Sequence, residues 1–137
     1  MTREELLASP PDDYMNAEQL GFFRELLRTL RAETMNNIED AKQRLAKPPE
    51  VNDDADRSSH EEEVRLALRI VDRERRLLPK IQAALDRIDD GEYGFCRETG
   101  EPIGLPRLLV RPTADLSAQA KELAERRERQ FVHKRDG

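Results

Sequence analysis

The spacing of apolar residues predicts two long helices in the first two thirds of the chain. Between residues 16 and 47 apolar side chains recur every three or four positions, and the same spacing continues from residue 64 to residue 88. This spacing places them on one face of each helix, where a partner helix can cover them. The two series are Leu20, Phe23, Leu27, Leu30, Ile38, Ala41 and Leu45, and Val64, Ala67, Val71, Leu78, Ile81, Leu85 and Ile88, with Thr34 and Glu74 as polar interruptions.

Helix-breaking residues set the limits of both helices. A Pro-Pro pair at 48–49 ends the first, and Gly91 is a good left-handed C-cap for the second. Two helices joined by a short turn form an antiparallel coiled-coil hairpin, predicted over residues 14–90 with an acidic tip near residues 50–60. Pro79 lies inside the second helix and lacks an amide N–H, which predicts a kink in the turn before it.

The segments outside the hairpin follow different patterns. Residues 1–13 contain Ser-Pro-Pro-Asp-Asp, which predicts a flexible N-terminal arm. After the hairpin, short β-like pieces over 93–96 and 108–111 are separated by turn residues, and a last helix begins near residue 113 or 115. The predicted fold class is mainly α: a long antiparallel coiled-coil hairpin, then a small zinc-ribbon-like domain with a C-terminal helix over 91–137.

Composition narrows the class of protein. Charged residues make up 39% of the chain and apolar residues 36%, which suits long two-sided helices better than one large globular core. A net charge of −5 argues against broad binding to nucleic-acid phosphates. No leader-like or membrane-spanning apolar stretch is visible, so we expect a cytoplasmic protein with no membrane contact. The sequence contains no nucleophile–base pair, phosphate loop or metal-ligand quartet, so we do not expect an enzyme.

Two charged clusters allow both a structural and a functional interpretation. Seven acidic residues lie between residues 50 and 63 against the single Arg57. They can cap the second helix, as can a Ser59–Glu62 capping box, or they can form an acidic tip that acts on a partner. The second cluster follows one face of that helix and is either a solvated, ion-paired face or a binding face. Its members are Arg65, Arg69, Arg73, Arg76 and Lys80.

Several segments together resemble the DksA family of bacterial transcription factors. The resemblance rests on "YMNAEQL", "DRSSHEEE", "DRERRLLPKI" and, most specifically, "YGFC", "EPIG" and "RPTADL". It implies a monomer that binds RNA polymerase directly and inserts its coiled-coil tip into the secondary channel. It also implies modulation of initiation, for example at ribosomal RNA promoters, together with the effector ppGpp and without sequence-specific DNA contact.

The resemblance also assigns roles to individual residues. Asp53 and Asp56 match the acids of the family's D-x-x-D-x-A tip motif, in which Ser58 stands here in place of alanine. Arg73 matches a position for contact with polymerase. The residues that match the ppGpp site, formed jointly with polymerase, are Leu77, Lys80, Arg111 and Lys121.

The zinc positions of the family are degenerate in this chain. Zinc-bearing members carry C-x2-C-x17-C-x2-C, and the matching residues here are Cys96, Thr99, Ser117 and Ala120. One thiolate, two hydroxyls and a methyl group cannot replace the four ligands of structural zinc, and the histidines at the tip and the tail are poorly placed to substitute. We therefore expect a zinc-independent branch with no metal cofactor. Thr99 and Ser117 are expected to bond to each other or to nearby amides, and Cys96 to be a packed structural thiol rather than a redox centre.

Two other functions fit the same features. A coiled-coil adaptor or chaperone would use the hairpin only for protein contacts. A transcript-cleavage factor would also place acids on a hairpin tip in the polymerase channel. Neutralising the tip aspartates distinguishes the first from the regulator, and an assay of RNA cleavage in backtracked complexes distinguishes the second.

Overall fold

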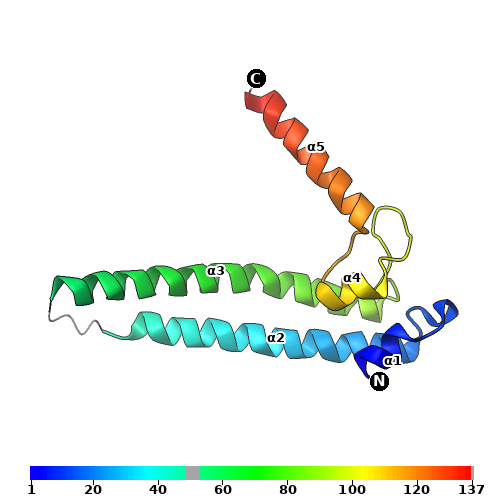
Figure 1. Ribbon diagram of the computed structural model, residues 1–137, viewed down its shortest axis with the longest axis horizontal. Helices are drawn as coiled ribbons and strands as arrows, with labels where there is room; N and C mark the ends of the chain where they lie inside the picture. Colours follow the sequence, from blue (N-terminus) through cyan, green and yellow to red (C-terminus); the bar gives the residue numbers. More distant parts are fainter. Residues whose placement is uncertain (49–52, 137) are drawn as a thin grey trace. The chain divides into compact units, whose positions relative to one another are not determined.

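The computed structural model describes residues 1–48 and 53–136, and side chains as far as residue 132. Its elements are α1 (Arg3–Leu7), the 3-10 turn η1 (Pro11–Asp13), α2 (Ala17–Ala46), α3 (Asp54–Asp89), α4 (Leu105–Val110) and α5 (Ala118–Asp136) (Figure 1). The chain forms two compact units. We call Arg28–Gln82 the hairpin unit, and Met1–Leu27 with Ala83–Gly137 the base unit.

The hairpin unit consists of the facing parts of α2 and α3, which lie side by side and antiparallel (Figure 1). One buried cluster in it consists of Ala41, Ala67 and Val71, with Leu45 and Ile70 packed against them. Small alanines on both helices allow close approach, and the covered face is the predicted apolar stripe. Helix α3 continues through Pro79 as one element of 36 residues.

The two polar interruptions of the stripe are buried. Thr34 is 1% exposed and satisfies its hydroxyl by donating to the Leu30 carbonyl at 2.7 Å. Glu74 is 7% exposed, and its Oε1 accepts a hydrogen bond from Asn37 Nδ2 at 3.2 Å across the hairpin. A buried carboxylate needs such partners because loss of hydration disfavours its charged form.

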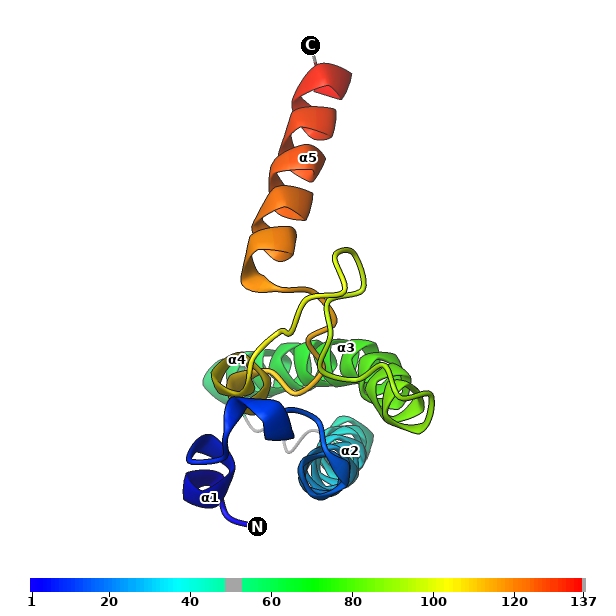
Figure 2. The ribbon, with the colours of Figure 1, turned by 90° about the vertical axis from the view of Figure 1, so that its right-hand side faces the viewer.

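The N-terminal segment differs from the expected loose arm over 1–13. Thr2 caps α1 by accepting from the amide of Glu5, and Leu6 is fully buried. Figure 2 shows α1 close to α4, which it contacts. The hydroxyl of Tyr14 donates to the carbonyl of Gly94 and accepts from the amide of Gly104. One buried apolar side chain and one half-buried, hydrogen-bonded tyrosine therefore hold this segment against the rest of the base unit.

The C-terminal part also departs from the prediction. Within the residues that the structure describes, the only β feature is an isolated bridge between Phe95 and Pro102. The expected β-piece over 108–111 is mostly helical, because α4 begins after Gly104 at φ 101° with proline in its first turn. A short run of leucine and valine fits either structure, and local packing decides between them.

The last helix begins later than predicted, at Ala118. Ser117 precedes it, and its Oγ accepts a hydrogen bond from the Ala120 amide at 3.1 Å. Leu116 is buried ahead of the helix, whereas Leu123 on the helix is 48% exposed. In the described parts of the chain, no helix is both long and apolar enough to cross a membrane.

Candidate functional site

Asp53 and Asp56 have different structural positions at the start of α3. The amide of Asp56 donates to Oδ1 of Asp53 at 2.8 Å, so Asp53 is a side-chain cap of this helix. Asp56 lies in the first helical turn, where the helix dipole favours negative charge. Both residues and Ser58 are exposed. The capping interpretation is confirmed for Asp53. The Ser59–Glu62 capping box is wrong, because α3 begins at Asp54.

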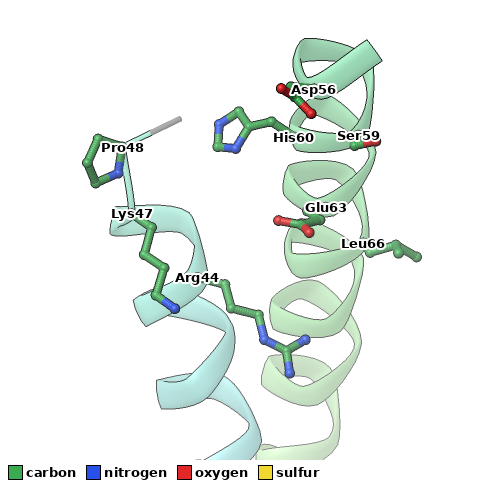
Figure 3. Close-up of a pocket in the computed structure, with 8 residues that line it drawn as sticks. All are labelled: Arg44, Lys47, Pro48, Asp56, Ser59, His60, Glu63 and Leu66. Carbon is green, nitrogen blue, oxygen red and sulfur yellow. The ribbon is translucent and has the colours of Figure 1, made fainter. Parts of the chain in front are cut away.

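A cleft of about 730 Å³ lies beside Asp56, between the end of α2 and the start of α3. Figure 3 shows Asp56, His60 and Glu63 on the side of α3 that faces α2, and Arg44 reaching toward them from α2. Lys47 also comes from the α2 wall, whereas Ser59 and Leu66 point away from it. One wall of the cleft is therefore cationic and the other carries carboxylates.

The cations of this cleft were not predicted from the sequence. Arg44 and Lys47 end a helix, and basic residues there are ordinarily explained by the helix dipole. The available signal was their place shortly before the Pro-Pro pair, a few residues ahead of the tip acids in the sequence. His60, one of the two histidines rejected as zinc ligands, also lines this cleft on the side of α3 that faces α2.

Most arginines on the basic face of α3 have acidic neighbours. Arg65 lies 3.9 Å from Glu61 and 3.8 Å from Glu62. Arg76 pairs with Asp72 at 3.0 Å, and its side chain is 76% exposed. Exposed pairs of this kind contribute little to stability, so these two positions fit the solvated-face interpretation.

Arg73 has a different partner. Its Nη2 lies 3.5 Å from Oε1 of the buried Glu74, the same oxygen that accepts from Asn37. The guanidinium itself remains exposed, with a side-chain exposure of 75%. Arg73 is therefore tethered to the hairpin interior while its donors face solvent. A small groove of about 230 Å³ beside it is lined by Asn37, Asp40, Ala41, Arg44, Ile70, Arg73 and Glu74.

The four residues matched to a ppGpp site fall in both compact units. Leu77 and Lys80 belong to α3 in the hairpin unit, where Leu77 is half-buried and Lys80 exposed. Arg111 follows α4 in the base unit and is exposed, and its amide donates to the Arg107 carbonyl. Lys121 is half-buried in the first turn of α5. Their joint use as one site stays a prediction.

The four degenerate zinc positions lie on two segments, one with Cys96 and Thr99 and the other with Ser117 and Ala120. Hydrogen bonds join these segments, and we call them the two halves of the knuckle. Thr99 Oγ1 accepts from the Glu101 amide at 3.2 Å, and Ser117 Oγ accepts from the Ala120 amide, so both hydroxyls bind nearby amides as expected. Cys96 is 3% exposed. Burial raises the pKa of its thiol, but the Thr99 hydroxyl and the amides of Ser117, Thr99 and Glu98 donate to the sulfur. Together these donors lower the pKa from 9.0 to about 6.

These residues do not fit a structural zinc ion. The four positions supply one sulfur, two hydroxyls that already accept backbone hydrogen bonds, and a methyl group. Among the side chains that the structure describes, over 1–48 and 53–132, no group of three or more His, Cys, Asp or Glu is arranged to hold a metal. Zinc in proteins takes four thiolate or imidazole ligands in such knuckles, and this donor set does not provide them.

Backbone and side-chain hydrogen bonds connect the two halves of the knuckle. The Arg97 amide donates to the Asp115 carbonyl at 2.8 Å. Arg87 Nη2 donates to the Phe95 carbonyl at 2.6 Å, and the Tyr93 hydroxyl donates to the Pro112 carbonyl at 2.8 Å. Burial raises the pKa of Tyr93, which keeps this hydroxyl a donor. These bonds join segments that a metal joins in zinc-bearing knuckles.

Two features define the class of this protein. One is a helical hairpin in which α3 begins with a capped acidic turn, and the other is the knuckle in the base unit. The family model described as "DnaK suppressor protein DksA, N-terminal domain" matches residues 19–88. The model described as "Prokaryotic dksA/traR C4-type zinc finger" matches residues 91–126. The chain belongs to the DksA family.

Individual relatives agree over nearly the whole length. The RNA polymerase-binding transcription factor DksA of Caulobacter vibrioides is 46% identical over 93% of this chain and 89% of the relative. Its counterpart in Escherichia coli is 42% identical over 90% and 82%. The solved structure of transcription factor DksA2 from Pseudomonas aeruginosa superposes with a TM-score of 0.75 at 46% identity. That match covers 93% of this chain and 99% of the other.

Proposed function

We propose that this protein is a transcription regulator that binds RNA polymerase directly and modulates initiation with the tip of its hairpin in the secondary channel. The observation that carries the proposal is the 42–46% identity, over most of the chain, to relatives named as RNA polymerase-binding transcription factors. The exposed Asp53 and Asp56 at the start of α3 support the assignment of the tip.

The tip acts through charge rather than through covalent chemistry. Asp53 accepts the capping hydrogen bond, and Asp56 carries its carboxylate in the first turn of α3. In a narrow protein channel these charges interact more strongly with nearby cations than they do in water, because screening is weak. Ser58 lies two residues after Asp56 on α3 and is also exposed.

The effector of the proposed regulator is ppGpp, bound jointly with polymerase. Lys80, Arg111 and Lys121 provide cations for its diphosphates, and Leu77 provides an apolar contact. Arg73 contacts polymerase directly. Its exposure supports this role, because most of its guanidinium donors are accessible to a partner.

The protein acts without zinc. Support comes from the donor set at Cys96, Thr99, Ser117 and Ala120 and from the hydrogen bonds that join the knuckle. We propose further that it works as a cytoplasmic monomer, without enzymatic activity of its own and without sequence-specific DNA contact. Its acidic net charge of −5 agrees with the last point.

The decisive experiment is transcription from a ribosomal RNA promoter by purified RNA polymerase. Adding the protein should lower the transcript yield, and ppGpp should deepen the effect. A cleavage assay on backtracked complexes belongs in the same set. Efficient cleavage without an effect on initiation would favour a cleavage factor, and binding without either effect would favour an adaptor.

A further inference from the structure

Arg107 makes a contact that none of the roles above uses. It lies on α4 and is half-buried, and its Nε donates a hydrogen bond of 3.2 Å to the carbonyl oxygen of Leu116. Leu116 is buried and lies two residues before the start of α5. This bond therefore joins α4 to the segment that leads into the last helix, and both residues belong to the base unit.

The backbone of Arg107 also holds Arg111, one of the cations of the proposed effector site. The Arg107 carbonyl accepts a hydrogen bond of 2.8 Å from the Arg111 amide, which is the C-cap bond of α4. Arg111 is the first residue beyond the helix, and its backbone is no longer helical, with φ −133° and ψ 83°. The position of Arg111 therefore depends on how the last turn of this short helix is held.

The other end of the bond is connected to Lys121, a second cation of that site. Ser117 follows Leu116 directly, and its carbonyl accepts a hydrogen bond of 2.9 Å from the Lys121 amide in the first turn of α5. The Ser117 hydroxyl also accepts from the amide of Ala120. Because these two bonds attach the first turn of α5 to Ser117, a shift of Leu116 would move Lys121 as well.

The chain connection by itself does not fix the two cations relative to each other. Arg111 and Lys121 are ten positions apart, and the chain between them is irregular until α5 begins. The hydroxyl of Tyr93 and the amide of Arg97 also bind this stretch, but both come from a segment ahead of α4. The bond from Arg107 is different, because its donor lies on the helix that ends next to Arg111.

This relation matters for a diphosphate, which brings its charged oxygens to both cations at once. A charge-assisted hydrogen bond is strong only at short range, about 2.7–2.9 Å between nitrogen and oxygen. Groups that already stand at the right separation lose less conformational entropy when the ligand binds. The Arg107 bond relates the backbone positions from which the side chains of Arg111 and Lys121 extend.

We propose that Arg107 is a positioning residue of the effector site, which sets the separation of Arg111 and Lys121 through its bond to Leu116. The proposal rests on the proposed function, because it needs ppGpp as the effector. Arg107 acts through its Nε–H on the chain itself and does not contact the effector. Loss of this donor should therefore weaken the response to ppGpp even though Arg111 and Lys121 are still present.

The main test changes Arg107 in the full-length protein and titrates ppGpp in transcription by purified RNA polymerase. Arg107→Met keeps an unbranched side chain and removes the donor, so the ppGpp concentration for half-response should rise roughly three- to tenfold. Arg107→Lys retains a charge and an N–H donor and should restore part of the response. The matched control is Arg97→Met, which removes an exposed guanidinium paired with Asp115 but keeps the backbone bond at the same place, and it should respond normally.

A double-variant cycle distinguishes positioning from direct contact. In an Arg111→Ala background the separation of the two cations no longer matters, so adding Arg107→Met should change the half-response concentration by less than about twofold. A direct contact between Arg107 and the effector would instead give independent fold-changes that multiply. Thermal unfolding and polymerase binding without ppGpp, measured on the same variants, report any general loss of structure.

Amide hydrogen exchange in the free protein tests the link without polymerase or ppGpp. Arg107→Met should speed exchange at the amides of Ala120 and Lys121, because the segment before α5 loses its attachment to α4. Arg97→Met should leave exchange at both amides unchanged.

Each outcome has a definite meaning. A normal ppGpp titration or unchanged amide exchange for Arg107→Met would overturn the positioning role and leave the proposed function intact. Fold-changes that multiply in the cycle, or an equal loss of polymerase binding without ppGpp, would overturn it as well. If ppGpp does not alter promoter inhibition by the wild type, the effector assignment fails and the positioning role fails with it. If the wild type has no effect on transcription, the proposed function fails too.

Discussion

The amide of Asp56 donates a 2.8 Å hydrogen bond to Oδ1 of Asp53, so one acid of the tip orients the helix that carries the other. This hydrogen bond distinguishes two contributions of the tip acids, helix capping and negative charge, which the sequence alone does not assign to one residue or the other. Asp53 has both a capping role and a charge, whereas Asp56 contributes charge in the first turn of α3. Variants at these positions can remove either contribution alone.

Asp53→Asn with Asp56→Asn should keep polymerase binding and abolish promoter inhibition. Asparagine caps a helix as well as aspartate does, so the fold is preserved while two charges are lost. Asp53→Ala should in addition lose about 1 kcal/mol of local helix stability, visible as faster amide exchange at Asp56. Asp54→Asn, which neutralises an adjacent first-turn acid, is the control and should inhibit normally. Full inhibition by the double variant would refute the charge mechanism.

Lys80→Ala, Arg111→Ala and Lys121→Ala should each weaken the response to ppGpp more than the activity without it. A charge-assisted hydrogen bond to a phosphate contributes roughly 1.5–3 kcal/mol, so the effector concentration for half-response should rise about tenfold or more. A titration of transcription with ppGpp measures this. Arg76→Ala is the control, since its guanidinium is paired with Asp72. Unaltered titrations for all three variants would refute a role of these cations in binding ppGpp.

Glu74→Leu should stabilise the hairpin unit by about 1 kcal/mol or more, because an apolar side chain replaces a buried carboxylate at a position of the apolar stripe of α3. The same change releases Arg73 and should weaken polymerase binding. Urea unfolding and a binding assay report the two effects. Glu74→Gln retains an acceptor for Asn37 and should lie between wild type and Glu74→Leu in binding. Lower stability of the leucine variant would mean that the contacts of Glu74 contribute more than its desolvation costs.

Cys96 should make stability depend on pH. Its folded-state pKa is lowered to about 6 from 9.0, so the thiolate contribution is absent below pH 6 and grows as the pH rises toward 9. The slope between these values is at most about 1.4 kcal/mol per pH unit. Thermal unfolding from pH 5.5 to 9 measures it, and Cys96→Ser should fold while losing this slope. An identical pH dependence in both proteins would show that the thiol stays protonated in this range.

A chelator should leave both the melting temperature and the activity unchanged. Hydrogen bonds from Arg97 and Tyr93 link the two halves of the knuckle, and Arg87 binds the carbonyl of Phe95. Because these bonds do not involve a metal, a chelator should not break them. Metal analysis of tag-free protein should find well below one zinc per chain, while a zinc-bearing relative treated in parallel should unfold. Release of zinc from this protein on Cys96→Ser substitution would reveal metal ligands outside the four knuckle positions.

The hairpin was predictable because its determinants are local and repetitive. Apolar residues every three or four positions define a face whether or not the partner helix is known, and burial of Ala41, Ala67 and Val71 follows from that period. Even the polar interruptions were visible at Thr34 and Glu74. The degenerate zinc positions were visible only through the resemblance to the DksA family, whose motif indicates which four residues to compare.

The tertiary structure decided the features that depend on contacts between distant segments. Leu6 in a proline-containing arm has no period to mark it, yet α1 buries it in the base unit. The run Leu105–Val110 is too short for periodicity to distinguish a helix from a strand, and Gly104 with Pro106 settles it as α4. The sequence by itself determined the hairpin, because the period of its apolar residues defines the covered face, and the family resemblance indicated which zinc ligands are replaced. Only the folded chain brought Arg44 opposite Asp56 and Glu63, because that depends on how separate segments meet.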